Sequence, residues 1–175
     1  QYQIDMHLKH NRSKGIAVNK IPMKKASELF GILNIVFFSP EDLNIIKNGP
    51  SERRHFLDAE LCQLDKIYLS DLSNYNKILN QRNKLLKDMV YRPELSDTLP
   101  VWDMQLIDTG KKIIRRREQF VKELNEIVHE IHYRISGGKE ELFLSYEPSV
   151  SADMMEQEIE RVRQRDLKMC QTSVG

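Results

Sequence analysis

The sequence has 175 residues, of which 40% are hydrophobic and 30% charged, a composition typical of a folded, soluble protein. Its 27 Lys and Arg balance 26 Asp and Glu, so the net charge neither supports nor excludes a nucleic-acid partner. Cys62 and Cys170 lack the spacing of a metal site, so we expect free thiols and no zinc cage. No stretch approaches the roughly 20 apolar residues of a membrane helix, so we expect no membrane contact and a cytoplasmic location.

The first fifty residues predict part of an α/β lobe. Apolar and polar side chains alternate over 4–8, and 16–21 forms a second apolar run, which predicts two strands joined by a hairpin loop at 10–15. Apolar side chains recur at helical spacing over 26–33, and the short apolar run 35–38 predicts a buried strand. Because the chain starts inside the first predicted strand, we expect it to be a piece of a longer protein.

The sequence Ser-Pro-Glu-Asp at 39–42 predicts the start of a helix. Ser can cap the helix, Pro suits its first position, and acids favour the positive end of the helix dipole. Gly49 and Pro50 end this helix, because Gly tolerates a left-handed cap and Pro cannot continue. Ser51 then predicts the N-cap of the next helix.

The middle of the sequence predicts two long amphipathic helices. Leucine and tyrosine side chains at steps of three, four or seven place an apolar stripe over 57–86, along one long helix or two helices end to end. A linker at 91–100 precedes a second stripe over 102–135, which Gly137 and Gly138 end. The second helix would span ~34 residues, or about 50 Å at 1.5 Å per residue. Each stripe needs a partner, so we expect an antiparallel helical arm.

Beyond the arm the pattern returns to a strand and a helix. Alternating side chains over 142–146 predict a strand. Asp153 and Glu156 resemble a capping box, and a final helix runs towards Lys168. The order predicts an α+β chain, mainly α, in which an antiparallel helical arm is inserted between small α/β pieces.

Catalytic and metal-binding patterns are weak. Ser136–Lys139 contains Gly-Gly-Lys but lacks the preceding Gly and the following Ser or Thr of a phosphate loop, so a helix stop is the better interpretation. Glu41 and Asp42 do not directly follow the apolar run as a Mg²⁺ ligand would. His129 and His132 could share a metal on one helix face, but a solvated face is favoured. Nucleophilic catalysis has no specific pattern behind it.

Basic residues gather in two stretches that could follow the phosphates of DNA. Asp88 is the one local acid among Lys77, Arg82, Lys84, Lys87 and Arg92. The second stretch contains Lys111, Lys112, Arg115, Arg116 and Arg117. Cations along a helix can bind phosphates by releasing counterions, although composition alone favours a solvated face. From these stretches we predict DNA contacts at Arg82, Lys84, Lys87, Lys111, Lys112, Arg115, Arg116 and Arg117.

Five stretches resemble the RecF family of bacterial recombination-repair ATPases. They are LNIVFFSPEDLNIIKNGPSERRHFLD at 33–58, YNKILNQRNKLLK at 75–87, VWDMQL at 101–106, IHYRISGGKEEL at 131–142 and TSVG at 172–175. The stretches follow the family's order and span nearly the whole chain, so the resemblance is specific. The sequence departs from the family pattern at His55, where another Arg is expected, and at Cys170, where Gly is usual.

The resemblance implies an incomplete ABC-type ATPase head, related to the heads of structural-maintenance-of-chromosomes proteins. It implies an ATP-dependent homodimer that binds gapped or junction DNA, acts with RecR and RecO to load RecA, and serves replication, recombination and the SOS response. ATP and Mg²⁺ would bind outside this segment, because the Walker A loop would precede Gln1 and the signature and Walker B motifs would follow Gly175. No catalytic residue, metal or cofactor is therefore expected within it. The alternative is a non-enzymatic helical scaffold that binds only protein partners.

The resemblance also divides the chain and gives two sets of residues a role. The expected parts are a partial ATPase lobe at 1–50, a helical arm at 51–136 and a return to the head at 137–175. The two sets are a nucleotide-sensing turn at Ser39, Glu41 and Asp42 and an arm junction at Ser51, Arg53 and Arg54. The turn could instead only cap a helix. The guanidinium groups of the junction would pair with an acid or contact phosphate.

Overall fold

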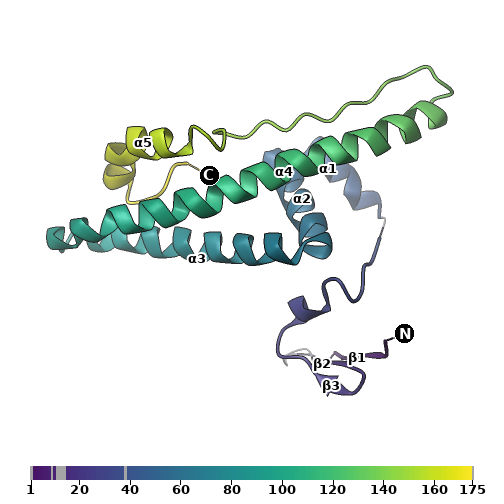
Figure 1. Ribbon diagram of the computed structural model, residues 1–175, viewed down its shortest axis with the longest axis horizontal. Helices are drawn as coiled ribbons and strands as arrows, with labels where there is room; N and C mark the ends of the chain where they lie inside the picture. Colours follow the sequence, from purple (N-terminus) through teal and green to yellow (C-terminus); the bar gives the residue numbers. More distant parts are fainter. Residues whose placement is uncertain (1, 9, 11–14, 38, 175) are drawn as a thin grey trace. The chain divides into compact units, whose positions relative to one another are not determined.

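The computed structural model describes residues 2–8, 10, 15–37 and 39–174, and the chain divides into two compact units, Gln1–Lys66 and Ile67–Gly175. Figure 1 labels their elements. The first unit contains β1 (Ile4–His7), β2 (Gly15–Val18), β3 (Ile21–Pro22), α1 (Asn44–Lys47) and α2 (Pro50–Leu64). The second contains α3 (Lys66–Asp88, whose first residue belongs to the first unit), α4 (Leu99–Ile135) and α5 (Met155–Met169).

The first two predicted strands form an antiparallel sheet with β3. Ile4 of β1 lies opposite Val18 of β2, and Val18 also pairs with Ile21 of β3. The predicted second strand ends early, because Asn19 and Lys20 adopt φ values of 51° and 68° and form a two-residue turn. The predicted hairpin is confirmed, although residues 11–14 of its loop lie outside the described residues.

The predicted buried strand at 35–38 is wrong for the residues that the structure describes. Ile35, Val36 and Phe37 form no regular element, and their side chains are 61%, 97% and 80% exposed. A strand needs a neighbour for its backbone groups, and the Ile35 N–H instead donates to Gln63 Oε1 at 3.2 Å. Phe38 lies outside the described residues. The predicted helix at 26–33 is reduced to a 3₁₀ turn, Ala26–Leu29.

The predicted helix start at 39–42 is confirmed. The Ser39 N–H donates to Asp42 Oδ2 at 2.7 Å, and a 3₁₀ turn, Pro40–Leu43, leads directly into α1. The next helix begins one residue earlier than predicted. Pro50 is the first residue of α2 and Gly49 is its N-cap, so the predicted capping role of Ser51 is wrong. Pro is favoured at this position because the first N–H of a helix has no acceptor.

The stripe over 57–86 lies on two helices rather than one. Asp65, with φ −135° and ψ 104°, ends α2 before α3 begins. A 3₁₀ turn, Pro93–Thr98, then leads into the 37-residue α4, which stops before Gly137 and Gly138 as predicted. Both glycines have positive φ, 65° and 76°, which a helix stop at this point requires.

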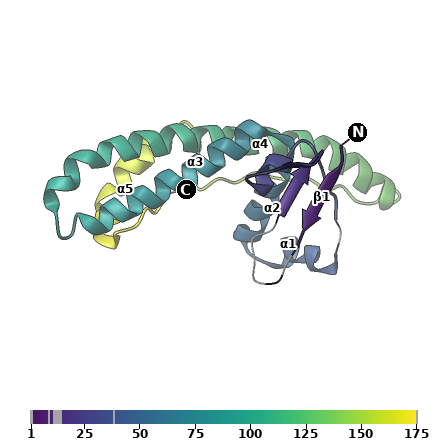
Figure 2. The ribbon, with the colours of Figure 1, turned by 90° about the horizontal axis from the view of Figure 1, so that it is seen from below.

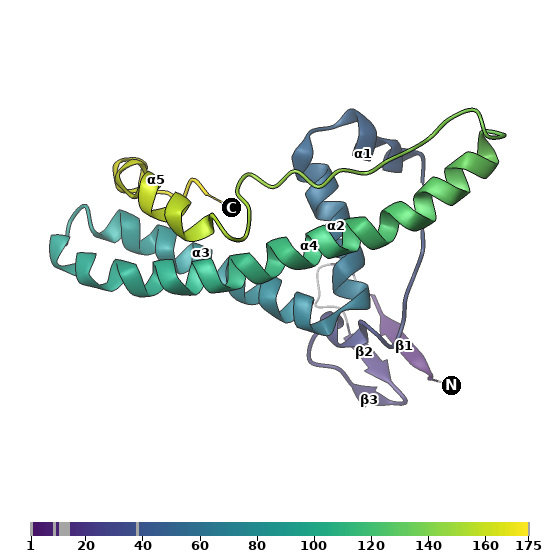
Figure 3. The ribbon, with the colours of Figure 1, turned by 45° about the horizontal axis from the view of Figure 1, so that its top comes forward.

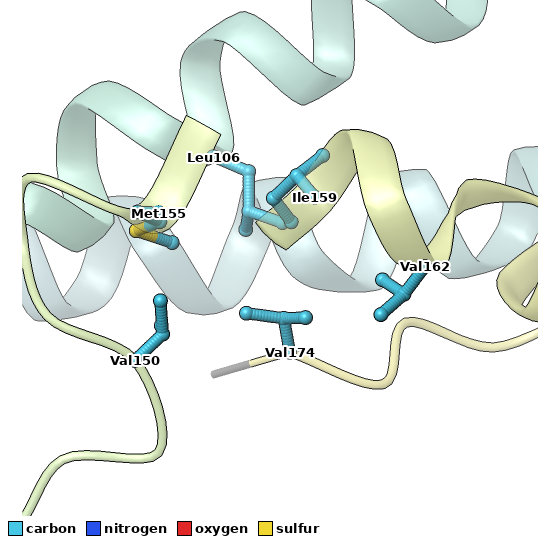
Figure 4. Packing of buried hydrophobic residues seen from close by; sticks show 6 residues of the cluster. All are labelled: Leu106, Val150, Met155, Ile159, Val162 and Val174. Carbon is cyan, nitrogen blue, oxygen red and sulfur yellow. The ribbon is translucent and has the colours of Figure 1, made fainter. Parts of the chain in front are cut away.

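The second unit is a helical hairpin covered by α5. Helices α3 and α4 run antiparallel and side by side (Figures 1 and 2), and Arg117 Nε of α4 donates to Tyr68 Oη of α3 at 3.0 Å. Side chains of α4, α5 and the segments that flank α5 form the core cluster in Figure 4. Its members are Leu106, Val150, Met155, Ile159, Val162 and Val174. The predicted antiparallel arm is therefore confirmed as a helical hairpin.

The predicted α4 stripe is buried along only part of its length. Leu106 and Ile113 are 0% and 4% exposed, whereas Ile127, Ile131 and Ile135 are 57%, 51% and 80% exposed. Helix α4 has 37 residues and α3 has 23, so α4 is longer by 37 − 23 = 14 residues, about 21 Å at 1.5 Å per residue. The C-terminal end of α4 therefore extends beyond α3, the helix that covers the first turns of α4.

The predicted strand at 142–146 is also wrong. This segment is extended and runs back along α4 in Figures 1 and 3, but it has no strand partner among the described residues. Asn125 of α4 replaces that partner: its Oδ1 accepts the Leu144 N–H and its Nδ2 donates to the Leu144 carbonyl, both at 2.7 Å. One amide side chain can thus satisfy both backbone groups of a residue without a sheet.

Helix α5 starts without the predicted capping box. Its N-cap is Met154, so Asp153 precedes the helix and instead pairs with Arg115 of α4 at 3.0 Å. The predicted end near Lys168 is confirmed, because α5 ends at Met169. Cys170 then adopts φ 51°, the left-handed conformation that favours the glycine expected from the resemblance. Both cysteines are free, as predicted.

Candidate nucleic-acid interface

The basic stretch of α4 is largely paired with acids. Lys111 pairs with Glu156 at 3.7 Å, Lys112 with Asp108 at 2.7 Å, Arg115 with Asp153 at 3.0 Å and Arg116 with Glu123 at 3.7 Å. The hydrogen bond from Lys112 to Asp108 raises the pKa of that lysine, and Arg117 donates to the Tyr68 hydroxyl. Exposed ion pairs of this kind are weak, but each acid cancels part of the field that would attract a phosphate.

Arg82 is not a surface residue, so its predicted DNA contact is wrong in this structure. Its side chain is fully buried. Its Nε donates to Asp103 Oδ1 at 2.7 Å, and its Nη1 donates to Asp166 Oδ2 at 2.8 Å. The two acids are 21 and 84 positions away in the sequence, so no local pattern could identify them as its partners. Arg163 pairs with the other oxygen of Asp103 at 2.9 Å and with Glu160 at 2.9 Å, so a second guanidinium group also contributes to the neutralisation of Asp103.

The outer side of α3 carries lysines without acids between them. We define the α3 lysine face as the exposed residues Ser73, Asn74, Lys77, Asn80, Gln81, Lys84 and Lys87. At about 100° per residue, Lys77 and Lys84 lie two turns apart on one line, about 10 Å from each other. No Asp or Glu occurs between Asp71 and Asp88, and among the described residues no ion pair reaches Lys77, Lys84 or Lys87. These lysines are therefore better placed than the α4 stretch to meet phosphate.

The three residues of the predicted sensing turn lie together at the start of the 3₁₀ turn Pro40–Leu43. The carboxylate of Asp42 accepts the Ser39 N–H, and Glu41 is exposed. A hydrogen bond from the Ser39 side chain, and then one from its own backbone N–H, lower the pKa of Glu41. The turn therefore presents an ionised carboxylate to solvent at neutral pH, beside a carboxylate that is used as a cap.

The residues of the predicted arm junction are exposed in the first turns of α2, and one of them has a structural partner. Arg53 Nη1 donates to the carbonyl oxygens of Ile45 and Asn48 at 3.2 and 3.0 Å, where α1 ends. A cation is favoured at the carbonyl end of a helix. Arg53 thus joins α1 to α2 through carbonyls rather than through an acid. Ser51 and Arg54 are exposed.

The two histidines of α4 pack against the return segment. The ring of His129 stacks on Phe143 with centroids 5.1 Å apart, and His132 Nε2 lies 3.6 Å from Glu140. Within the described residues no three His, Cys, Asp or Glu side chains come together as a metal site would require.

Burial, and then the charge of nearby acids, raises the pKa of Cys62, which disfavours the nucleophilic thiolate.

None of the described helices combines the length and apolar character that a membrane span needs.

No protein-family model matches the chain. Three curated relatives, each named DNA replication and repair protein RecF, match it at 67% identity in Agathobacter rectalis, 59% in Lachnospira eligens and 54% in Lachnoclostridium phytofermentans. The matches cover 99% to 100% of this chain but 48% to 49% of each relative, so the chain spans about half the length of the curated relatives it matches.

Solved structures give the same relationship. A structure of the recombination mediator protein RecF-ATPrS in the RecFOR pathway matches with a TM-score of 0.87 at 34% identity, and one of RecF-ATP matches with 0.85 at 33%. Each match covers 99% of this chain and 49% of the solved chain. The helical hairpin and the small sheet therefore form part of an ABC-type ATPase fold, as expected.

Proposed function

Because this chain is a segment that belongs to the RecF family of replication and repair proteins, we propose that its α3 lysine face binds the phosphate backbone of DNA. The observation that carries the proposal is the run of exposed lysines on α3 without an intervening acid. Lysines bind phosphates by displacing condensed counterions, which requires no particular base sequence. The face supplies affinity for the backbone, and its Asn and Gln amides add neutral hydrogen-bond donors.

The affinity for DNA should depend on salt through the α3 lysine face. Replacing Lys77, Lys84 and Lys87 by Gln should reduce the slope of log affinity against log salt by about 3, because each phosphate contact contributes about −0.9. Near 150 mM salt this corresponds to a loss of affinity of roughly tenfold or more. Fluorescence anisotropy of a gapped duplex, with full-length protein and ATP between 50 and 200 mM salt, provides the measurement.

A matched control removes the same charge from α4. Replacing Lys111, Lys112 and Arg115 by Gln deletes three cations that already pair with acids. This variant should retain a salt slope within about one unit of the unmodified protein. Equal losses from both triple variants would mean that only total charge matters, and a loss from the α4 variant alone would place the contact on α4.

We propose the remaining properties of the whole protein by analogy with its relatives. We infer that the full-length protein is an ATPase whose ATP and Mg²⁺ bind to parts that lie outside this chain, and that it forms an ATP-dependent homodimer in the cytoplasm. RecR and RecO are its proposed partners at gapped or junction DNA, where it promotes RecA loading. Support comes from the solved relatives, whose descriptions name RecF-ATP and the RecFOR pathway. In this arrangement residues 51–136 serve as the arm between the parts at 1–50 and 137–175.

The turn at Ser39, Glu41 and Asp42 is proposed to sense the nucleotide. Its support is one exposed carboxylate beside a capped 3₁₀ turn, a local structure that a nearby phosphate or Mg²⁺ can shift between two packings. Replacing Glu41 and Asp42 by Gln and Asn in the full-length protein should reduce the ATP dependence of DNA binding severalfold. Unchanged ATP dependence, with an unchanged melting temperature, would contradict the proposal.

A further inference from the structure

Two adjacent residues on the inner side of α3 hold the segment that follows α5. The N–H and the hydroxyl of Thr172 both donate to Asn83 Oδ1, at 2.8 and 2.7 Å. Arg82 Nη1 donates to the Thr172 hydroxyl oxygen at 2.7 Å. The backbone and side chain of Thr172 are thus both tied to α3.

Asp166 of α5 holds the same segment from the other side. Its Oδ1 accepts the N–H and the hydroxyl of Ser173 at 2.9 and 2.6 Å, while its Oδ2 accepts from Arg82. Val174 is buried in the core cluster directly afterwards. We refer to Arg82, Asn83, Asp166, Thr172 and Ser173 as the latch.

The two α3 residues of the latch lie on the same turns of the helix as the α3 lysine face. Gln81 and Lys84 of the face are the sequence neighbours of Arg82 and Asn83, and their side chains are exposed while Arg82 is fully buried. Since a helix turns by about 100° per residue, neighbouring residues face different directions on a shared backbone. A movement of α3 that phosphate contacts impose on its outer side therefore also moves the donors and acceptors on its inner side.

We propose that α3 couples DNA binding at the lysine face to the position of residues 172–174. This inference rests on the proposed function of that face. The latch bonds are short, directional and partly ionic, so a small displacement of α3 favours either a latched or a released segment. In the latched state, the turns of α3 that carry Lys84 are held in place. The α3 lysine face is therefore ordered before it binds phosphate. By reciprocity, DNA tightens the latch and a loosened latch weakens DNA binding.

A pair of Thr172 variants tests the coupling without changing any charge. Thr172→Val removes the hydroxyl that bonds Arg82 and Asn83, whereas Thr172→Ser retains it. In the full-length protein with ATP, Thr172→Val should bind gapped DNA about fivefold more weakly, at the low end of typical coupling. Thr172→Ser should bind within about twofold of the unmodified protein. In the unmodified protein, saturating gapped duplex should slow hydrogen exchange of the Thr172 and Ser173 amides severalfold.

The possible results separate this inference from the proposed function. If Thr172→Val speeds hydrogen exchange at these amides but leaves the affinity for DNA unchanged, the coupling is overturned, and the proposal that the α3 lysine face binds DNA is unaffected. If the triple Lys→Gln variant of α3 binds DNA normally, the face and the coupling are both overturned. The exchange measurement on the unmodified protein needs no substitution, so a DNA complex without slower exchange at Thr172 also overturns the coupling, whatever the stability of the variants.

Discussion

Replacing Arg82 by Met should lower the free energy of unfolding of the second unit by about 3–5 kcal/mol. The substitution keeps much of the apolar volume but leaves Asp103 and Asp166, which are 3% and 0% exposed, without the cation that lies between them. Asp103 keeps its pair with Arg163, whereas Asp166 loses its ion pair and, as a buried carboxylate, keeps the cost of leaving water. Trp102 is the one tryptophan of the chain and lies on α4, so urea unfolding followed by its fluorescence reports on this unit.

A double-mutant cycle distinguishes a real ion pair from a simple loss of packing. Asp166→Asn removes the acid charge while keeping the size of the side chain. If Arg82 and Asp166 interact as the 2.8 Å contact indicates, the double variant should be less destabilised than the sum of the single variants by about 1–3 kcal/mol. Strictly additive effects, or a loss below about 1 kcal/mol for Arg82→Met, would contradict the latch as a stabilising element.

The helical hairpin could be predicted because its information is local and repeated. The stripes over 57–86 and 102–135 each contain many apolar side chains at one spacing, so a single exception does not change the prediction. The stops are equally local, since Gly137 and Gly138 take the positive φ values that few other residues accept. The antiparallel arrangement then follows from a short connection between two amphipathic helices.

The two wrong strand predictions share a physical cause. A short apolar or alternating run shows which side chains avoid water, but a strand also needs a neighbouring backbone. At 142–146 that neighbour is replaced by Asn125, a single polar side chain of α4. At 35–37 the apolar side chains are exposed, and the Ile35 N–H donates to the side-chain oxygen Oε1 of Gln63 instead of to a strand. The sequence pattern is identical whether or not a neighbouring strand is present.

The candidate site could be predicted only in part for a related reason. A list of basic residues does not reveal which of them have acids nearby in space. Arg82, Lys84 and Lys87 look alike in the sequence, yet Arg82 is buried between two distant acids and the lysines are exposed. The absence of acids between Asp71 and Asp88 is the signal that could have favoured α3 over α4 from the start.

Replacing Leu106 by Ala should destabilise the second unit by about 2–5 kcal/mol. Leu106 is 0% exposed and lies in the core cluster with Met155 and Ile159, where α5 packs on the hairpin. Truncation removes buried apolar surface and leaves a cavity that two helices and the segment at Val174 cannot easily close. Because Val174 belongs to this cluster, hydrogen exchange at the adjacent latch amides should also become faster.

The same helix supplies a matched control for this prediction. Ile131 lies on α4 within the predicted stripe but is 51% exposed, so Ile131→Ala should change the free energy of unfolding by no more than about 0.5–1 kcal/mol. Both variants keep a good helix former in α4, so the difference between them measures burial rather than helix propensity. Equal losses from the two variants would mean that the end of α4 is as well covered as its middle, which would contradict the exposed stripe. Urea unfolding followed by Trp102 fluorescence distinguishes these outcomes.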